Sequence, residues 1–160
     1  MTGSRDGERG SYPEMVDALT SHGAQAKADA LSLYRRVVFN VLISNVDDHM
    51  RNHGFLWLGK SGWTLSPAYD LNPVPTDLKA RVLTTNIDLE EGTCSVDLLL
   101  EEAAEYFGSG LAQARSIIKE VAMVTSSWRD IAKNVGAKSS EISRMASAFE
   151  HDDLQRALAL

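Results

Sequence analysis

The hydrophobic pattern at the start of the chain predicts two helices. After a polar stretch over residues 1–12, Pro13 stands where the first turn of a helix tolerates proline, and the helical pattern continues to Leu19. Gly23 belongs to a short break, after which residues 24–43 form the second predicted helix. Its apolar positions recur at helical spacing: Leu31, Tyr34, Val37, Val38 and Leu42. We expect residues 1–12 to be a flexible lead-in, and the second helix to become buried on all sides towards its end.

A polar loop and a β-hairpin are predicted next. Residues 44–52 are almost all polar, in contrast to the helix before them. Two runs that contain aromatic residues, 54–58 and 63–66, then flank a Gly-bounded four-residue turn, which is typical of a hairpin. In such a hairpin Trp57 and Trp63 are expected to pack as cross-strand partners.

The remainder of the chain is predicted to be mainly helical. Residues 67–75 contain three prolines and cannot form regular structure, whereas residues 82–87 have the pattern of a short strand. Three helices follow: from Ser95 to Gly108, from Ser109 to Gly136, and from Ser139 or Ser140 through Phe149. The expected fold class is therefore mainly α with a small β-hairpin, in one domain over residues 13–160.

Composition and charge narrow the class of protein. With 160 residues, 44% of them hydrophobic and 24% charged, the chain resembles an ordinary soluble domain. The net charge of −6 argues against direct nucleic-acid binding, and no apolar run is long enough for a membrane span. The single cysteine, Cys94, excludes an internal disulfide and fits the cytoplasm. It has no basic neighbour in sequence, so a catalytic thiol is not expected.

The polar loop carries more functional side chains than a surface turn needs. Six of its residues are of this kind: Asn45, Asp47, Asp48, His49, Arg51 and Asn52. Asp47 and Asn52 have the D-x-x-x-x-N spacing that kinase catalytic loops use for a base aspartate and a metal-binding asparagine. An aspartate can accept or orient the proton of an incoming hydroxyl, and an amide oxygen is a hard ligand for Mg²⁺.

A second carboxylate follows the predicted hairpin. Asp70 lies in the Pro-rich stretch Pro67-Ala68-Tyr69-Asp70, which would fix the direction of its side chain. Kinases deliver a metal-binding aspartate from a loop at this point of the chain, after the catalytic loop and a short hairpin. The order of the three elements therefore predicts that Asp47, Asn52 and Asp70 converge on one surface.

Other interpretations of the loop remain open. His49 and His53 stand four apart, which on a helix would present two histidines to zinc, although no glutamate separates them. Asp48-His49 is also found in metal-dependent phosphohydrolases, which need further histidines upstream, where only His22 is available. The plainest alternative is a solvated turn with a capping aspartate.

The segment VVFNVLISNVDDHMRNHGFLWLGKSGWTLSPAYDLNPVP resembles the core of the HipA-like Ser/Thr protein kinases. It contains the pattern N-x-D-x-H-x-x-N over residues 45–52, followed by P-x-Y-D over residues 67–70. The resemblance is clearest over residues 34–75 and extends more loosely through the C-terminal helices. It implies a fold like the large, C-terminal lobe of protein kinases.

The resemblance also implies roles for individual residues. Asp47 matches the catalytic aspartate of the family, and Asn52 and Asp70 match its two magnesium ligands. His49 matches the loop histidine, which we interpret as a hydrogen-bonding support of the loop, and Asn45 is expected to support the loop as well. At Arg51 the chain departs from the lysine that is more usual, which leaves a phosphate contact there in doubt.

The family further implies ATP and Mg²⁺ as cofactors and phosphorylation of a protein Ser/Thr hydroxyl. Its toxins can act on an aminoacyl-tRNA synthetase and are usually restrained by a helix-turn-helix antitoxin. The first 33 residues contain neither a Gly-rich phosphate loop nor a strand lysine, since Lys27 lies in a helical pattern. The expected activity therefore depends on an ATP-binding lobe, and a decayed kinase that acts only as a protein-binding module is the alternative.

Overall fold

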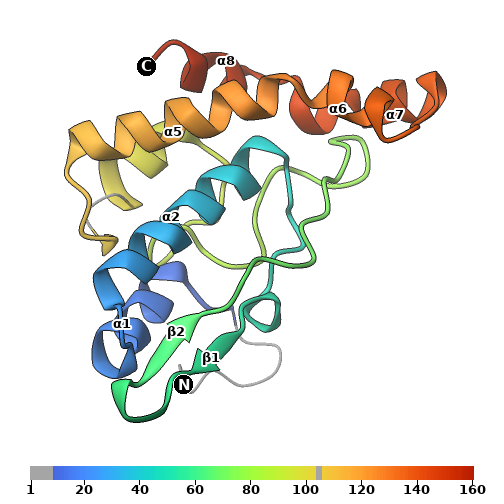
Figure 1. Ribbon diagram of the computed structural model, residues 1–160. Coiled ribbons are helices and arrows are strands. Elements are labelled where there is room, and N and C mark those ends of the chain that lie inside the picture. Colours follow the sequence, from blue (N-terminus) through green and yellow to red (C-terminus); the bar gives the residue numbers. More distant parts are fainter. Residues whose placement is uncertain (1–8, 104–105) are drawn as a thin grey trace.

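Helices build most of the structure, a computed structural model that describes residues 9–103 and 106–160. Helices α5 to α8 lie together on one side, α2 runs beneath α5, and α1 and the hairpin lie at the other end (Figure 1). The order is α1 (Tyr12–His22), α2 (Ala26–Leu42), η1 (Met50–Asn52), β1 (Phe55–Trp57), η2 (Gly59–Ser61), β2 (Trp63–Leu65), α3 (Val96–Leu98), η3 (Leu99–Ala103), α5 (Leu111–Ser126), α6 (Trp128–Asn134), α7 (Ser139–Phe149) and α8 (Asp152–Leu158). The predicted fold class, mainly α with a two-stranded hairpin, is confirmed. Within the described ranges, no helix combines the length and apolar character that crossing a membrane requires.

Helix α1 begins with a capping box. The Ser11 hydroxyl accepts a hydrogen bond from the Glu14 N–H, and the Glu14 carboxylate accepts one from the Ser11 N–H (2.7 Å). Residues just before the helix are also fixed, because the Asn86 N–H donates to the Gly10 carbonyl and its carbonyl accepts from the Tyr12 N–H. These residues were expected in the flexible lead-in, whose residues 1–8 lie outside the described part of the chain.

Helix α2 is the centre of the hydrophobic core. It packs against α1 on one side and α5 on the other, and its second half has no exposed apolar face. The fully buried apolar residues of this helix are Leu33, Tyr34, Val37, Val38, Val41 and Leu42. The buried character that the sequence predicted for the end of this helix is confirmed.

The hairpin has the predicted register and is anchored to α2. Trp57 pairs with Trp63, and their rings lie 5.0 Å apart at 54°. The buried Asp29 of α2 accepts hydrogen bonds from the Thr64 hydroxyl (3.0 Å) and the Leu65 N–H (3.1 Å). These hydrogen bonds hold the hairpin in a fixed orientation against α2. The Pro-rich turn follows directly after the hairpin in the chain.

The segment 82–87 does not form the predicted strand. It makes two isolated bridges, an antiparallel one between Val82 and Thr93 and a parallel one between Asn86 and Ser11, and no ladder. The N–H groups of Thr84 and Thr85 donate instead to the polar loop. The prediction was wrong because β-propensity does not say whether a neighbouring strand is available to pair with.

The helix predicted from 109 to 136 is two helices, α5 and α6. The chain breaks after α5, where the Ser126 hydroxyl donates to the Met123 carbonyl (2.7 Å) and the Ser127 hydroxyl to the Val124 carbonyl (2.8 Å). Serine side chains that bond the preceding turn compete with the helical backbone. After the break, α6 continues beyond the end of α5, and α7 packs against α6 (Figure 1).

Two other helical features were not predicted. Ser95 caps α3 as expected, accepting from the Leu98 N–H (3.2 Å), but the helix continues as the π-helical turn η3. Helix α8 begins after His151, whose Nδ1 accepts from the Leu154 N–H (3.3 Å). The acidic pair at the start of α8 is typical of a first helical turn and could have predicted it.

Candidate active site

The polar loop leaves α2 through a left-handed residue. Ser44 has φ = 55°, and its hydroxyl donates to the Ala148 carbonyl (2.8 Å) while accepting from Arg81 Nε (3.0 Å). The same guanidinium donates to the Val41 carbonyl (2.9 Å) and pairs with Asp153 of α8. The sharp exit from α2 is therefore held by the C-terminal helices and not by the loop alone.

Asp48 is the buried anchor of the loop. Its side chain is 1% exposed, and Oδ2 accepts hydrogen bonds from the Tyr12 hydroxyl and from Asn40 Nδ2 (2.9 Å). His53 Nε2 lies 2.9 Å from the same oxygen. Burial, and then the neighbouring Asp48 charge, raise the pKa of Tyr12 well above its ordinary value. The kinase interpretation of the sequence assigned no role to Asp48, because Tyr12, one of its main partners, lies 36 positions away in the chain.

Two threonines fix the backbone on either side of Asp47. The Val46 carbonyl accepts from the Thr84 N–H (3.1 Å) and hydroxyl (2.9 Å). The Asp48 carbonyl accepts from the Thr85 N–H (3.1 Å) and hydroxyl (2.7 Å). The N–H groups of Thr84 and Thr85, which were expected to pair with a neighbouring strand, therefore bond the polar loop instead. We call this arrangement, formed by Thr84 and Thr85 on Val46 and Asp48, the threonine clamp.

Asp47 itself faces solvent. Its side chain is 63% exposed, whereas the neighbouring residues Val46 and Asp48 are buried. Oδ1 accepts a hydrogen bond from Lys79 Nζ (3.2 Å), in a surface ion pair that is itself open to water. An exposed carboxylate on a fixed backbone is accessible to an incoming hydroxyl, as the predicted catalytic role requires.

Of the four remaining loop residues Arg51 is exposed, and the other three lie on the inner side of the loop. Asn52 ends the 3-10 turn η1 and is buried, with its N–H donating to the His49 carbonyl (2.8 Å). Asn45 Nδ2 donates to Asn40 Oδ1 (3.0 Å), which links it to the Asp48 anchor. His49 Nδ1 is buried without a hydrogen-bond partner in the part of the chain that the structure describes. The expected supporting role of the His49 ring thus remains a prediction.

Asp70 has an unusual backbone conformation. It has φ = 56°, in the left-handed region that a non-glycine residue seldom adopts, and its side chain is exposed. Oδ1 accepts a hydrogen bond from Asn72 Nδ2 (2.6 Å). Strained residues of this kind occur often at functional sites, where the surrounding structure holds them.

The turn that carries Asp70 is bound to the polar loop on both sides of that residue. Before it, the Tyr69 hydroxyl donates to the Arg51 carbonyl (2.9 Å), directly next to Asn52 in the chain. After it, the Val74 N–H donates to the Ser44 carbonyl at the start of the loop (3.1 Å). The turn is therefore attached to the loop at two points, one on each side of Asp70.

The ligand types at this site suit Mg²⁺ better than zinc. Asn52 and Asp70 offer hard oxygens, and Mg²⁺ binds through few protein oxygens together with water and substrate phosphates. Over residues 9–103 and 106–160 there is no group of three or more His, Cys, Asp or Glu side chains that could hold a metal by itself. His53 bonds Asp48 and packs edge-on against Tyr12, so the two-histidine zinc alternative gains no further ligand.

Cys94 is not a nucleophile. Its side chain is buried, and burial raises the pKa of its thiol to about 12. The thiol therefore stays protonated at neutral pH, as expected from the absence of a basic neighbour in sequence.

Comparison with known proteins gives two matches of different kinds. No curated protein matches the sequence significantly. The structure is similar to a HipA chain of Shewanella oneidensis MR-1, solved in a complex described as the toxin–antitoxin system HipA, HipB and its operator DNA. The TM-score is 0.65 at 21% identity, over 99% of this chain and 36% of that one. This chain therefore spans little more than a third of that relative's length.

The complex that contains the Shewanella HipA concerns the expectation, drawn from the net charge of −6, that this chain does not bind nucleic acid directly. Because that complex contains operator DNA, the comparison does not support the view that proteins of this kind make no contact with nucleic acid.

The family match is independent of the structural one. The model for the HipA-like C-terminal domain matches residues 2–128, well over half of the sequence. The chain belongs to the family of HipA-like C-terminal domains.

Proposed function

We propose that this chain is the catalytic and magnesium-binding lobe of a HipA-like protein Ser/Thr kinase. The single observation that supports it best is the attachment of the Asp70 turn to the Asp47–Asn52 loop by the Tyr69 and Val74 hydrogen bonds. A base loop and a metal-binding turn that are held together are what phosphoryl transfer requires of this lobe. ATP would be held by a further lobe, in the same chain or in a partner.

Each residue has a defined task in this proposal. Asp47 accepts or orients the proton of the substrate hydroxyl while that oxygen forms its bond to the γ-phosphorus and the bond to the ADP oxygen breaks. Asn52 and Asp70 provide amide and carboxylate oxygens for Mg²⁺. The metal, when bound, neutralises charge on the phosphate oxygens. The buried Asp48 takes no part in the reaction and holds the loop in shape.

The biological setting is proposed by analogy with the relative. That HipA is described in complex with HipB and operator DNA, so we propose a HipB-like helix-turn-helix antitoxin as the partner of this protein. The protein would then be the toxin of a cytoplasmic toxin–antitoxin pair. A protein such as an aminoacyl-tRNA synthetase is the proposed substrate.

Metal binding tests the assignment of Asp70 and Asn52. Millimolar Mg²⁺ should shift the NMR signals of the Asn52 side-chain amide and the Asp70 N–H, with weak affinity because the phosphate ligands are missing. Asp70→Asn should remove these shifts. Asp17→Asn, the same change at an exposed position of α1, should keep them.

Equal shifts in wild type and Asp70→Asn would mean that the ion binds elsewhere and that Asp70 is only a turn residue. The proposal would then lose its metal site, and a protein-binding module derived from a kinase would remain as the function.

A further inference from the structure

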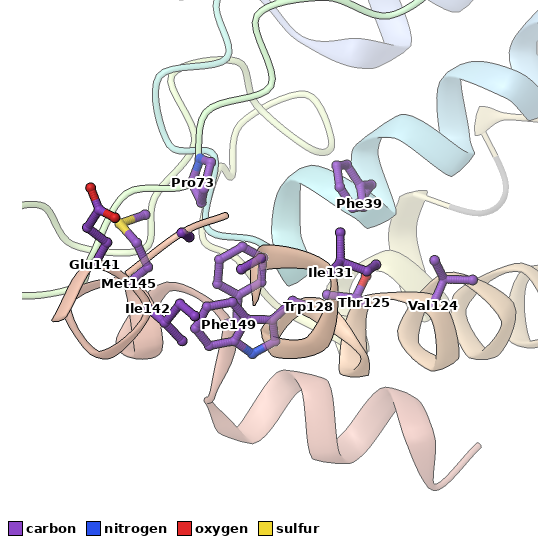
Figure 2. A pocket seen from close by; sticks show the side chains of 12 residues that line it. Phe39, Pro73, Val124, Thr125, Trp128, Ile131, Glu141, Ile142, Met145 and Phe149 are labelled. Carbon is purple, nitrogen blue, oxygen red and sulfur yellow. The ribbon is translucent and has the colours of Figure 1, made fainter. Parts of the chain in front are cut away.

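An apolar pocket lies among the C-terminal helices. Helices α5, α6 and α7 form its walls, and Phe39 of α2 and Pro73 of the turn close it from the other side (Figure 2). Its volume is about 420 Å³, within the range of pockets that bind small molecules. A second cavity of about 530 Å³ adjoins it along α5 and shares Phe39, Val124 and Thr125 with it.

The lining of the pocket is aromatic and aliphatic. Trp128 and Phe149 stack with their ring centroids 4.4 Å apart and their planes at 6°. The Arg129 guanidinium lies 4.8 Å from the centroid of the Trp128 ring, so both faces of Trp128 are covered and the outer face of Phe149 is the flat aromatic part of the lining. Val124 and Ile131 on the adjacent helices are 66% and 50% exposed to water. Large apolar side chains gathered around a hollow, and left in contact with water, are a common mark of a ligand site.

One buried polar atom in the lining has no partner. Thr125 is 4% exposed, and its hydroxyl makes no hydrogen bond with any residue that the structure describes. A helical threonine can satisfy its hydroxyl on a carbonyl of the preceding turn, and a buried hydroxyl left unpaired is costly. Figure 2 shows Thr125 and Ile131 on the side of the helices that faces Phe39. The unpaired hydroxyl therefore lies in the wall of the pocket.

The single carboxylate at the rim is already engaged. Glu141 belongs to the first turn of α7, and its Oε2 accepts a hydrogen bond from the Lys138 N–H (2.7 Å). Since Glu141 is the one charged residue among those that line the pocket, the site offers little to a charged ligand. Its chemistry favours a neutral molecule.

We propose that this pocket binds a small, neutral, flat aromatic molecule with one hydrogen-bonding group, which pairs with the Thr125 hydroxyl. The outer face of the Phe149 ring, which Trp128 supports from behind, accounts for the flat aromatic part. The unpaired hydroxyl accounts for the one polar group. The proposal does not rest on the phosphotransfer site, because Thr125, Trp128 and Phe149 lie outside the loop and the turn, although Pro73 of the turn contributes to the lining.

Indole and indene provide a matched pair of probes. They have nearly the same size and shape, but indene carries a CH₂ group where indole has its N–H. We expect indole, titrated into the full chain and followed by amide NMR shifts, to perturb the residues of the pocket. It should bind about three- to tenfold more tightly than indene, as one net hydrogen bond predicts.

Two variants with one control complete the test. Thr125→Val keeps the shape of the side chain and should remove the preference for indole over indene. Ala132→Leu, which fills the pocket from α6, should weaken both probes at least about tenfold, an effect typical of steric exclusion by overpacking. Ala112→Leu, at an exposed position of α5 outside the pocket, should bind both probes as wild type does.

Three results would overturn the proposal. One is the absence of amide shifts around the pocket with millimolar indole. Another is a preference for indole that persists in Thr125→Val. The third is unchanged binding in Ala132→Leu, which would place the probes elsewhere. Should Thr125→Val fail to fold, the Ala132→Leu and Ala112→Leu pair still decides.

Discussion

The buried hydroxyl of Tyr12 is predicted to be a main support of the catalytic loop. It donates to Asp48, the residue that anchors the loop, and Asn40 and His53 contact the same carboxylate oxygen. Tyr12→Phe removes that donor without changing the shape of the core. A hydrogen bond to a charged group contributes about 1.5–3 kcal/mol, so we expect a loss of about 2 kcal/mol in the free energy of unfolding.

Tyr34 offers a matched control. It is as fully buried as Tyr12, but its hydroxyl donates to the neutral Leu99 carbonyl (2.9 Å). Tyr34→Phe should cost about 1 kcal/mol, the usual net value for a neutral hydrogen bond. For a domain of this size each kcal/mol lowers the Tm by about 2–4 °C, which gives about 4–8 °C for Tyr12→Phe against about 2–4 °C for Tyr34→Phe.

Urea denaturation of the two variants and wild type, followed by circular dichroism, measures both losses. Amide NMR shifts over residues 45–53 should also change in Tyr12→Phe and remain unchanged in Tyr34→Phe. A loss of unfolding free energy in Tyr12→Phe no larger than that in Tyr34→Phe would refute the reasoning. The hydrogen bond to the Asp48 carboxylate would then stabilise the fold no more than the one to the Leu99 carbonyl.

Two further predictions concern pH and activity. Burial lowers the pKa of His151, whose neutral ring both caps α8 through Nδ1 and contacts the Leu42 carbonyl through Nε2. A base with a depressed folded-state pKa contributes stability that is present above its unfolded pKa of about 6.5 and is lost as the pH falls below it. Denaturation at pH 7.5 and pH 5.5 should show this loss in wild type and a smaller one in His151→Asn, in which asparagine can still cap the helix. The 160-residue chain alone, given labelled ATP, Mg²⁺ and a protein mixture, is expected to transfer no phosphate, since phosphate positioning requires a further lobe. Metal-dependent incorporation that disappears in Asp47→Ala would contradict this expectation.

The sequence predicted the first two helices and the hairpin because local periodicity and turn residues determine them. The pairing of Trp57 with Trp63 follows from the hairpin alone, and the burial of α2 follows from its composition. Local pattern could not distinguish the two adjacent aspartates of the loop. Asp47 is exposed and Asp48 is buried because Tyr12, 36 positions away, supplies a donor to one of them.

The same limit applies to the C-terminal half. The apolar periodicity from 109 to 136 is continuous, and it does not reveal that Ser126 and Ser127 divide it into two helices. The pocket exists because of that division, since α5, α6 and α7 each contribute to its lining. The unpaired hydroxyl of Thr125 is a property of the packed structure, because a helical threonine in sequence carries no sign of it.

The threonine clamp has a consequence for the thermodynamics of substrate binding. Ordering the backbone of one residue costs roughly 1–2 kcal/mol of conformational entropy. Because the clamp fixes the backbone around Asp47, this entropy is lost when the domain folds and not when a substrate binds. A hydroxyl that docks there would restrict the rotation of one side chain and leave the main chain as it was. Complexes at this loop should therefore form with a small entropic penalty, and calorimetry of Thr85→Val should show that penalty rise while the contacts of Asp47 remain the same.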